Sequence, residues 1–222
     1  MPADPQRVPA ATAGTTRDLL LDWGERMFAE RGIHGVSMRE IGLAANQRNN
    51  GVTQYHFGDK SGLIRAIFER RAATVNRRRL ELLEEHSRNG RDDVGALIDA
   101  YVTPLAEQVT VGTWYVPFLS RLQAEHQRDE LLARQNDTVN TAYDAVRNRL
   151  KNEHLSGLST EQFAIRWRIA LNLVIDALAD YQTNGAGDRR RPSLDVFRAE
   201  LVGAVTAILT RDAVGQSAEA AG

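Results

Sequence analysis

The sequence has no cysteine among its 222 residues. Disulfide bonds and thiolate metal sites are therefore excluded, and a reducing compartment fits the chain better than secretion. No uncharged stretch approaches the ~20 residues that cross a bilayer. The first 13 residues carry three prolines and no continuous apolar run, so they do not resemble a signal peptide. We expect a cytoplasmic protein with no membrane contact.

The sequence also lacks the motifs of common enzyme classes. It contains no G-x-S-x-G, no Walker or dinucleotide-binding glycine pattern and no H-E-x-x-H. The five histidines are scattered. Glu125, His126 and Asp129 could ligate a metal from one helix, but a solvated helix end is the more ordinary interpretation. We expect no enzymatic activity, no cofactor and no metal.

Charge is unevenly distributed, although the net charge is only -1. Residues 1–79 hold 13 Lys+Arg and 8 Asp+Glu, a balance of +5, whereas residues 80–222 hold 15 and 21, a balance of -6. Mixed-sign surfaces are ordinary, so this asymmetry is a weak signal by itself. It favours contact between a polyanion and the N-terminal third alone.

Apolar periodicity predicts an all-α fold of about nine helices. From Thr15, apolar residues recur on one helical face until Gly32. Ser37 and Glu40 have capping-box spacing before a short helix to about Ala45, and Asn46 suits the sharp turn that follows. Further helices are expected at about 61–87, 92–109, 113–125, 129–154, 160–183 and 193–211. The charged stretch 70–79 is expected to be a solvated helix face.

Residues 50–57 are ambiguous. Asn50-Gly51 before Val, Thr, Tyr and Phe also suits a hairpin turn entering a strand. No partner strand is near and both neighbouring segments are helical, so we favour a short helix capped by Asn49 or Asn50. Three helices in residues 15–57, the last two short, are the arrangement that places a helix in the major groove of DNA.

The side chains around that last helix suit DNA contact. Arg48 can bind guanine in a bidentate manner, and Asn49, Asn50 or Gln54 can bind adenine. Phosphate or thymine-methyl contacts are assigned to Ser37, Arg39, Thr53, Tyr55, His56 and Lys60. The alternatives are structural: Asn49 or Asn50 only caps the helix, His56 fills a helix interface, and Tyr55 and Phe57 are partly core.

Several of these residues match the signature of a known protein family. The stretch S-M-R-E-I-(x)3-A, a turn, and then Q-Y-H-F-G-D-K-S-G-L-I is similar to the signature of the tetracycline-repressor-like (TetR-type) regulators. The matching positions are Tyr55, His56, Phe57, Lys60 and Leu63, within residues 15–68, and Gln54 stands where that family usually has a tyrosine. The resemblance implies a helix-turn-helix domain at 14–60 and an effector-binding and dimerisation domain at 61–212. The Pro/Ala-rich composition of residues 1–13 predicts a disordered tail, and residues 213–222 are expected to be a frayed tail.

The resemblance also implies an effector cavity in the larger domain. Its candidate lining is aromatic and apolar: Trp114, Tyr115, Phe118, Leu119, Leu122, His126, Tyr143, Trp167, Leu171 and Val174. Each of these residues is also suited to an ordinary core. A cavity lined in this way predicts a small, mostly apolar effector, with Arg121, Gln123, His126 and Arg168 as polar partners.

The last two helices are apolar over a wide arc, which predicts a two-fold homodimer through a four-helix bundle. The candidate interface is Phe163, Ile169, Leu173, Phe197, Leu201, Val205 and Ile208. The sequence thus predicts a dimeric repressor that binds a palindromic operator in double-stranded DNA and is released by an effector. The first competing hypothesis is a helical scaffold or partner-binding protein without a DNA role, and the second is an enzyme.

Overall fold

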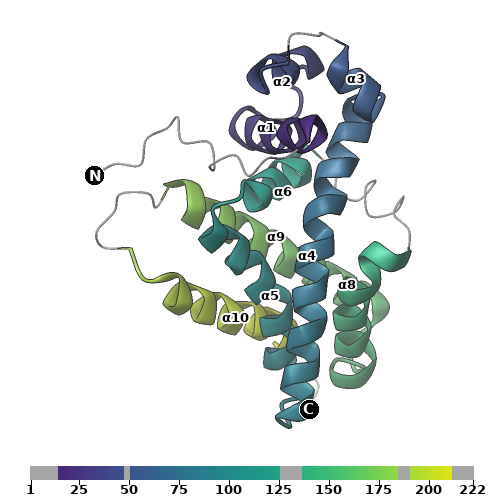
Figure 1. The fold of residues 1–222 in the computed structure, drawn as a ribbon. Helices are drawn as coiled ribbons and strands as arrows, with labels where there is room; N and C mark the ends of the chain where they lie inside the picture. Colours follow the sequence, from purple (N-terminus) through teal and green to yellow (C-terminus); the bar gives the residue numbers. More distant parts are fainter. Residues whose placement is uncertain (1–14, 48–50, 126–136, 185–190, 212–222) are drawn as a thin grey trace, which may run out of the picture.

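The computed structural model describes residues 15–47, 51–125, 137–184 and 191–211 (Figure 1). Within these ranges the chain forms helices and no strand, which confirms the all-α prediction. In chain order they are α1 (Thr16–Arg31), α2 (Met38–Ala44), α3 (Val52–Phe57), α4 (Lys60–Arg88), α5 (Val94–Val111), α6 (Tyr115–Ala124), α8 (Asp137–Arg149), the π-helical turn η1 (Leu150–His154), α9 (Thr160–Asn184) and α10 (Leu194–Thr210).

The first two helices begin where local hydrogen bonding favours them. Thr15 and Asp18 form a capping box at α1, and Ser37 and Glu40 form the predicted one at α2. After α2 the chain reverses at Asn46, whose φ of 55° lies in the left-handed region that asparagine tolerates. Both the capping box and the turn residue are therefore confirmed.

Residues 52–57 form the helix α3, not a strand. Gly51 occupies the N-cap position, with no side-chain capping hydrogen bond from the described residues. Asn49 and Asn50 lie outside the described residues. Within the described residues the helix is held by packing against α1, α2 and α4.

Helix α4 runs from the α1–α3 end of the molecule to its opposite end (Figure 1). Its 29 residues span about 44 Å at the usual rise per residue. Asp59 caps its start by accepting the N–H of Gly62, and Gly90, at φ 68°, follows its end. Helix α1 crosses α4 closely at Gly24, where a Cβ would lie 3.0 Å from Ile67 Cδ1. The helix therefore joins the small N-terminal unit to the larger one.

The stretch 70–79 of α4 is not the solvated face that its charge predicts. Arg70 and Arg71 pair with acidic side chains of α1, Arg78 pairs with Glu107 of α5, and Arg79 is buried. Composition could not reveal this, because the acidic partners come from other helices.

In the larger domain, α5 and α8 pack directly against α4. Helix α6 packs against both α1 and α9, while α10 packs against α5 and α9. Pro117 lies in the first turn of α6, where a missing N–H breaks no helical hydrogen bond, and Pro104 lies inside α5. No helix in the described part of the chain is long and apolar enough to cross a membrane.

Candidate nucleic-acid interface

Helices α2 and α3 form one end of the molecule, beyond α1 (Figure 1). Helix α3 is anchored by Val52 and Phe57, which pack partly buried against the core. Its other face is open: Gln54 is exposed, and Tyr55 is 86% exposed. Tyr55 is therefore not a core residue, in contrast to one of the sequence-based alternatives. The open face carries polar and aromatic groups that can meet a nucleic acid groove.

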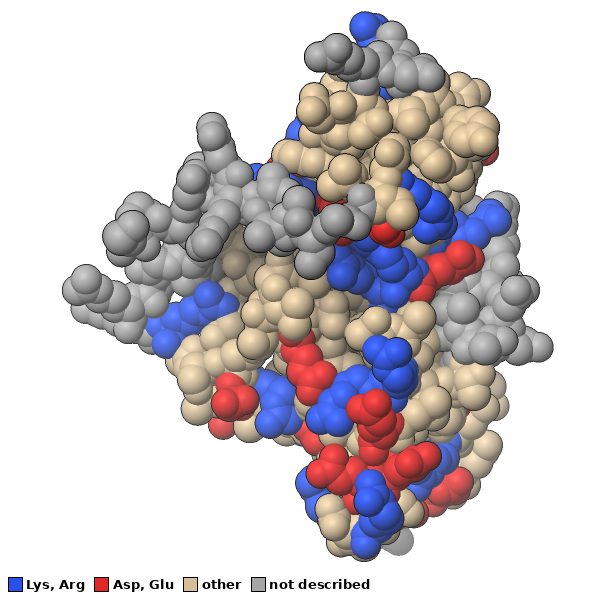
Figure 2. Space-filling model, in the orientation of Figure 1, with Lys and Arg blue, Asp and Glu red and all other residues tan. Residues whose placement is uncertain are grey.

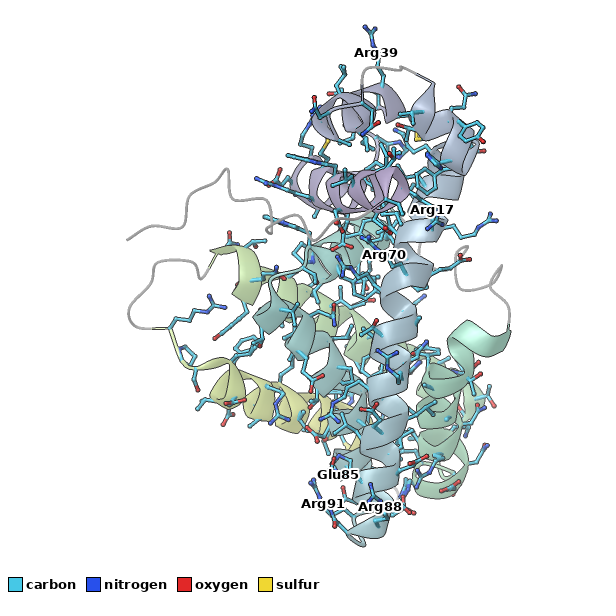
Figure 3. The ribbon with its side chains drawn as sticks, viewed as in Figure 1. Arg17, Arg39, Arg70, Glu85, Arg88 and Arg91 are labelled. Atoms are coloured by element: carbon cyan, nitrogen blue, oxygen red, sulfur yellow. The ribbon has the colours of Figure 1, made fainter. Side chains whose placement is uncertain are left out.

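The start of α2 lies beside this face. Arg39 is exposed and extends from the tip of the molecule, away from its body (Figure 3). Ser37 holds the helix start, since its hydroxyl accepts the Glu40 N–H and donates to Oε2 of Glu40 at 2.7 Å. The other carboxylate oxygen of Glu40 accepts from Arg31 at 2.7 Å. Hydrogen bonds from Arg31 and Ser37 lower the pKa of Glu40 to about 2.

Thr53 cannot reach DNA as the sequence predicts. Its side chain is 1% exposed, and a Cβ at Gly42 would lie 3.1 Å from its hydroxyl oxygen. This oxygen has no hydrogen-bond partner among the described residues. Thr53 lies on the face of α3 that packs against α2, so it belongs to the helix interface and not to the open face.

Lys60, predicted to bind phosphate, already has a partner in the chain. Its Nζ donates to the carbonyl oxygen of Ile33 at 3.0 Å, which ties the start of α4 to the segment after α1. An ammonium has two further N–H donors, so this bond leaves the phosphate role open. His56 is partly buried, with its ring 5.4 Å from the Tyr55 ring. Arg48 lies outside the described residues.

The sequence analysis did not predict one cation that lies beside α3. Arg17 is exposed on the first turn of α1, and its guanidinium lies over the Phe57 ring, 5.3 Å from the centroid (Figure 3). In the view of Figure 2, the α2–α3 end shows few acidic groups and a basic group at its tip, while acidic and basic groups mix over the lower part of the molecule. This distribution suits contact with a polyanion at the α2–α3 end.

The α1–α3 unit is tied to the larger domain through α6. Glu25 of α1, 1% exposed, accepts the backbone N–H of Trp114 at 2.9 Å and binds Arg71 of α4 at 2.7 Å. Arg121 of α6 donates to the carbonyl oxygen of Ala29 at 3.1 Å. The periodicity of α6 marks its apolar face but gives no sign of these polar ties.

A further tie lies at the end of α6. Glu125 Oε1 accepts the N–H of Ile33 at 2.8 Å, and its Oε2 lies 3.2 Å from His34 Nε2. Glu125 therefore binds the segment between α1 and α2. His126 and Asp129 lie outside the described residues.

The predicted effector-site residues lie in the interior of the larger domain. The buried ones are Tyr115, Phe118, Leu119, Leu122, Trp167, Leu171 and Val174, with Trp114 and Tyr143 partly buried. The proposed polar partners point elsewhere: Arg121 binds α1, Gln123 binds Asp176 at 3.2 Å, and Arg168 is exposed. A buried cation that the sequence did not indicate, Arg79, lies in this domain instead.

The predicted dimer residues divide into two groups. Phe163, Leu201 and Val205 are buried within the chain itself and are core residues, unavailable to a partner. Phe163, for example, stacks on Trp167 with centroids 6.2 Å apart. The rest keep exposed surface: Ile169, Leu173, Phe197 and Ile208. A wide apolar arc in the sequence therefore combines an inward face with a smaller outward one.

One group of possible metal ligands lies close together in the described residues. Asp92, Glu153 and His154 place their ligand atoms within 4.8 Å of one another. Arg149 pairs with both carboxylates, so the cluster already holds a positive charge. Asp92 and Glu153 are exposed and His154 is partly buried, and all three lie far along the chain from α1–α3.

Comparison with known proteins adds to this geometry. Residues 20–67 match the family model of the bacterial regulatory proteins of the tetR family. No curated protein sequence matches the chain. The fold is similar to that of a putative TetR-family transcriptional regulator from Rhodococcus sp., with 18% identity over 88% of this chain and 98% of that chain and a TM-score of 0.52. It is also similar to the fatty acid degradation regulator FadR from Bacillus halodurans, with 15% identity over 90% of this chain and 96% of that chain and a TM-score of 0.56. The TetR-family regulator PfmR from Thermus thermophilus has 18% identity over 86% of this chain and 96% of that chain, with a TM-score of 0.53.

A helix-turn-helix at one end of a larger helical body defines a class of DNA-binding proteins. The family-model match at residues 20–67 covers most of α1, then α2, α3 and the start of α4. The N-terminal part of the chain is thus similar to the DNA-binding part of the tetR family regulators, and the fold of the chain is similar to that of solved TetR-family structures.

Proposed function

We propose that the protein is a dimeric repressor that binds a palindromic operator and leaves it when a small, mostly apolar effector binds the larger domain. The observation that carries the proposal is the open face of α3, anchored on one side by Val52, Phe57 and Thr53 and exposing Gln54 and Tyr55 on the other. In this proposal residues 14–60 bind DNA and residues 61–212 bind the effector and dimerise.

The contacts divide into two kinds. Gln54 and the residues before α3 read bases, because the first turn of a recognition helix reaches furthest into the groove. Arg39, Tyr55 and Lys60 hold phosphates, and Arg17 joins them from α1. Phosphate contacts fix the register of the protein on the duplex, and the base contacts give sequence preference.

The dimer supplies the second recognition helix. Ile165 and Ile169 are one turn apart on α9 and are 45% and 47% exposed, while Val196 of α10 is 55% exposed. Exposed large apolar side chains on two packed helices favour burial against the same surface of a second copy. Two copies related in this way present two α3 helices to successive major grooves, ~34–36 Å apart.

The effector acts by changing that spacing. The polar ties of α6 to the N-terminal unit, through Glu25, Arg121 and Glu125, make α6 move with α1. An effector that binds more tightly to the arrangement with the wrong spacing shifts the population towards it.

Selection of bound sites from a random duplex library tests the proposal. The expected product is an inverted repeat whose half-sites are about one helical turn apart, bound with an affinity that falls as salt rises. A helical scaffold without a DNA role would enrich no sequence. Enrichment of a single half-site without symmetry would contradict the dimer, and no enrichment would contradict the operator itself.

A further inference from the structure

Arg79 is an unusual arginine for its place in the fold. It lies on α4 inside the larger domain, is 4% exposed, and forms no ion pair with a carboxylate of the described chain. Nη1 donates to Asn76 Oδ1 at 2.7 Å, and Nη2 makes a long contact of 3.4 Å to the carbonyl oxygen of Tyr101. Nε has no hydrogen-bond partner within the described residues.

The other buried or half-buried arginines nearby show the contrast. Arg71 pairs with Glu25 and Arg78 with Glu107, each through a hydrogen bond of 3.0 Å or less. Arg79 instead faces aromatic rings and neutral oxygens. A buried cation without a counter-ion is costly, and burial accordingly lowers the pKa of the Arg79 guanidinium, although arginine stays charged near neutral pH.

An aromatic cluster adjoins this cation. The Tyr101 ring lies under the Arg79 guanidinium, 4.7 Å from centroid to Cζ. Tyr101 in turn contacts Trp167 and Tyr143, with ring centroids 5.5 and 6.3 Å away, and Trp167 Nε1 donates to the Tyr143 hydroxyl at 2.8 Å. The cation–π contact offsets part of the cost of burial but supplies no negative charge.

The free edge of the guanidinium has a definite chemical preference. Nε and Nη2 lie on the same edge, so an unpartnered Nε–H beside a weakly bound Nη2 forms a fork for two acceptor oxygens. A carboxylate matches this fork in shape and supplies the missing charge. The aromatic rings beside it suit a flat or apolar body.

We propose that the effector carries a carboxylate that binds the Nε–Nη2 edge of Arg79, while its apolar body contacts Tyr101, Tyr143 and Trp167. This inference rests on the proposed function, because it names the chemical class of the ligand that the larger domain receives. It replaces Arg121 and Arg168, the cations that the sequence suggested, with Arg79.

Matched pairs of probes test the inference on the full chain. 4-Phenylbutyrate is compared with 4-phenylbutyramide, and octanoate with octanamide, by isothermal titration calorimetry near neutral pH. Each pair shares its apolar body, so the difference in affinity isolates the carboxylate. We expect at least one carboxylate to bind about tenfold or more tightly than its amide, since hydrogen bonds to charged groups in a buried site favour the charged ligand. Equal affinity within both pairs, or no binding by either carboxylate, overturns the proposal.

Variants assign the preference to Arg79. Arg79→Gln should abolish the preference for the carboxylate, whereas Arg77→Gln, an exposed arginine two residues away on α4, should keep it. Arg79→Lys keeps the charge without the planar fork and should retain only part of the preference, which provides a second test if the glutamine variant does not fold. An unchanged preference in the Arg79 variants overturns the assignment.

The outcome is separable from that of the proposed function. Probe binding is measured without DNA, and operator selection is performed without probes. Sequence-specific DNA binding with no carboxylate preference contradicts only the ligand class. A carboxylate preference that depends on Arg79, in a chain that enriches no DNA sequence, contradicts only the repressor proposal.

Discussion

Glu25 accepts the backbone N–H of Trp114 at 2.9 Å across 89 positions of the sequence, and its second oxygen binds Arg71. One buried carboxylate thus joins α1 of the DNA-binding unit to the start of α6 and to α4. Arg70 lies within 3.5 Å of the same oxygen (Figure 3). Removing the Glu25 carboxylate leaves Nε of Arg71 and the backbone N–H of Trp114 without this acceptor.

We therefore expect Glu25→Ala to destabilise the protein by about 3 kcal/mol, the lower end of the cost of breaking a buried ion pair. Urea unfolding followed by circular dichroism measures the change. Glu30→Ala is the matched control on α1, because Glu30 pairs with Arg26 one turn away and is more exposed than Glu25. The control should lose about 0.5 kcal/mol or less. Similar losses for both variants would contradict the bridging role of Glu25.

Thr53→Val tests whether Thr53 belongs to the interface between α2 and α3 and not to the DNA-binding face. Valine has the shape of threonine without the buried hydroxyl that lacks a partner in the described structure. We expect stability to rise by about 1 kcal/mol, since the cost of desolvating that hydroxyl disappears. Operator affinity should stay within a factor of two, measured by fluorescence anisotropy. A large loss of affinity at unchanged stability would mean that the hydroxyl contacts DNA.

The local parts of this fold were predictable from the sequence. Capping at Ser37 and Glu40, the left-handed turn at Asn46 and the end of α4 near Asn89 all depend on residues within a few positions of one another. The start of α3 was not, because its N-cap is Gly51 and its stability comes from packing. Local hydrogen bonds form between residues that are close in the sequence, whereas packing depends on residues that are far apart in it.

The candidate sites show the same division. Exposure of Gln54 follows from helical periodicity, but burial of Thr53 depends on how closely α2 approaches at Gly42. The charge run in α4 gave no sign that Arg79 is buried, since its surroundings come from α5 and other helices. Phe163 likewise belongs to the core and not to a dimer surface, because Trp167 stacks on it. Contacts with other helices decide the burial of Thr53 and of Arg79.

Glu40 makes the stability of the N-terminal unit depend on pH. Its pKa in the folded protein is about 2, below the ordinary value of 4.5, through hydrogen bonds from Arg31 and Ser37. Its contribution is therefore complete above about pH 4.5 and is lost as the pH falls towards 2. Glutamine cannot ionise, so Glu40→Gln should be less stable than the wild type near pH 6, and the gap should narrow towards pH 3.

Urea unfolding of both proteins across this pH range measures the gap. Glu69→Gln, at an exposed site on α4, is the control, and its difference from the wild type should change little with pH. A gap for Glu40→Gln that widens on acidification would have the wrong sign for a carboxylate stabilised in its charged form.

The outward face of α9 gives a prediction for assembly. Ile169 is 47% exposed in the single chain, so an acidic residue there is tolerated by the monomer but not by an apolar interface. Ile169→Asp should shift the sedimentation coefficient from dimer to monomer while the helical circular dichroism signal stays. Leu80→Asp is the control, because Leu80 is 41% exposed on α4, which packs against α1, α5 and α8. A dimer that survives Ile169→Asp would move the interface to another surface.

Arg39 and Gln54 separate the two kinds of DNA contact. Arg39 extends from the molecular tip, where a phosphate contact adds affinity on any sequence. Arg39→Ala should weaken operator and random duplex alike and reduce the slope of log affinity against log salt by about 1. Gln54→Ala should leave that slope unchanged and lower the preference for operator over random duplex by about 1–3 kcal/mol.

Fluorescence anisotropy on both duplexes at four or more salt concentrations distinguishes the two effects. Arg88→Ala is the control for the loss of a cation, because Arg88 lies at the far end of α4 from α2 and α3 (Figure 3). It should change neither the slope nor the preference, since a charge about 40 Å away is screened beyond the Debye length of ~8–10 Å. If Arg39→Ala behaves like this control while Gln54→Ala changes the salt slope, then α3 meets the phosphate backbone and another element reads the bases.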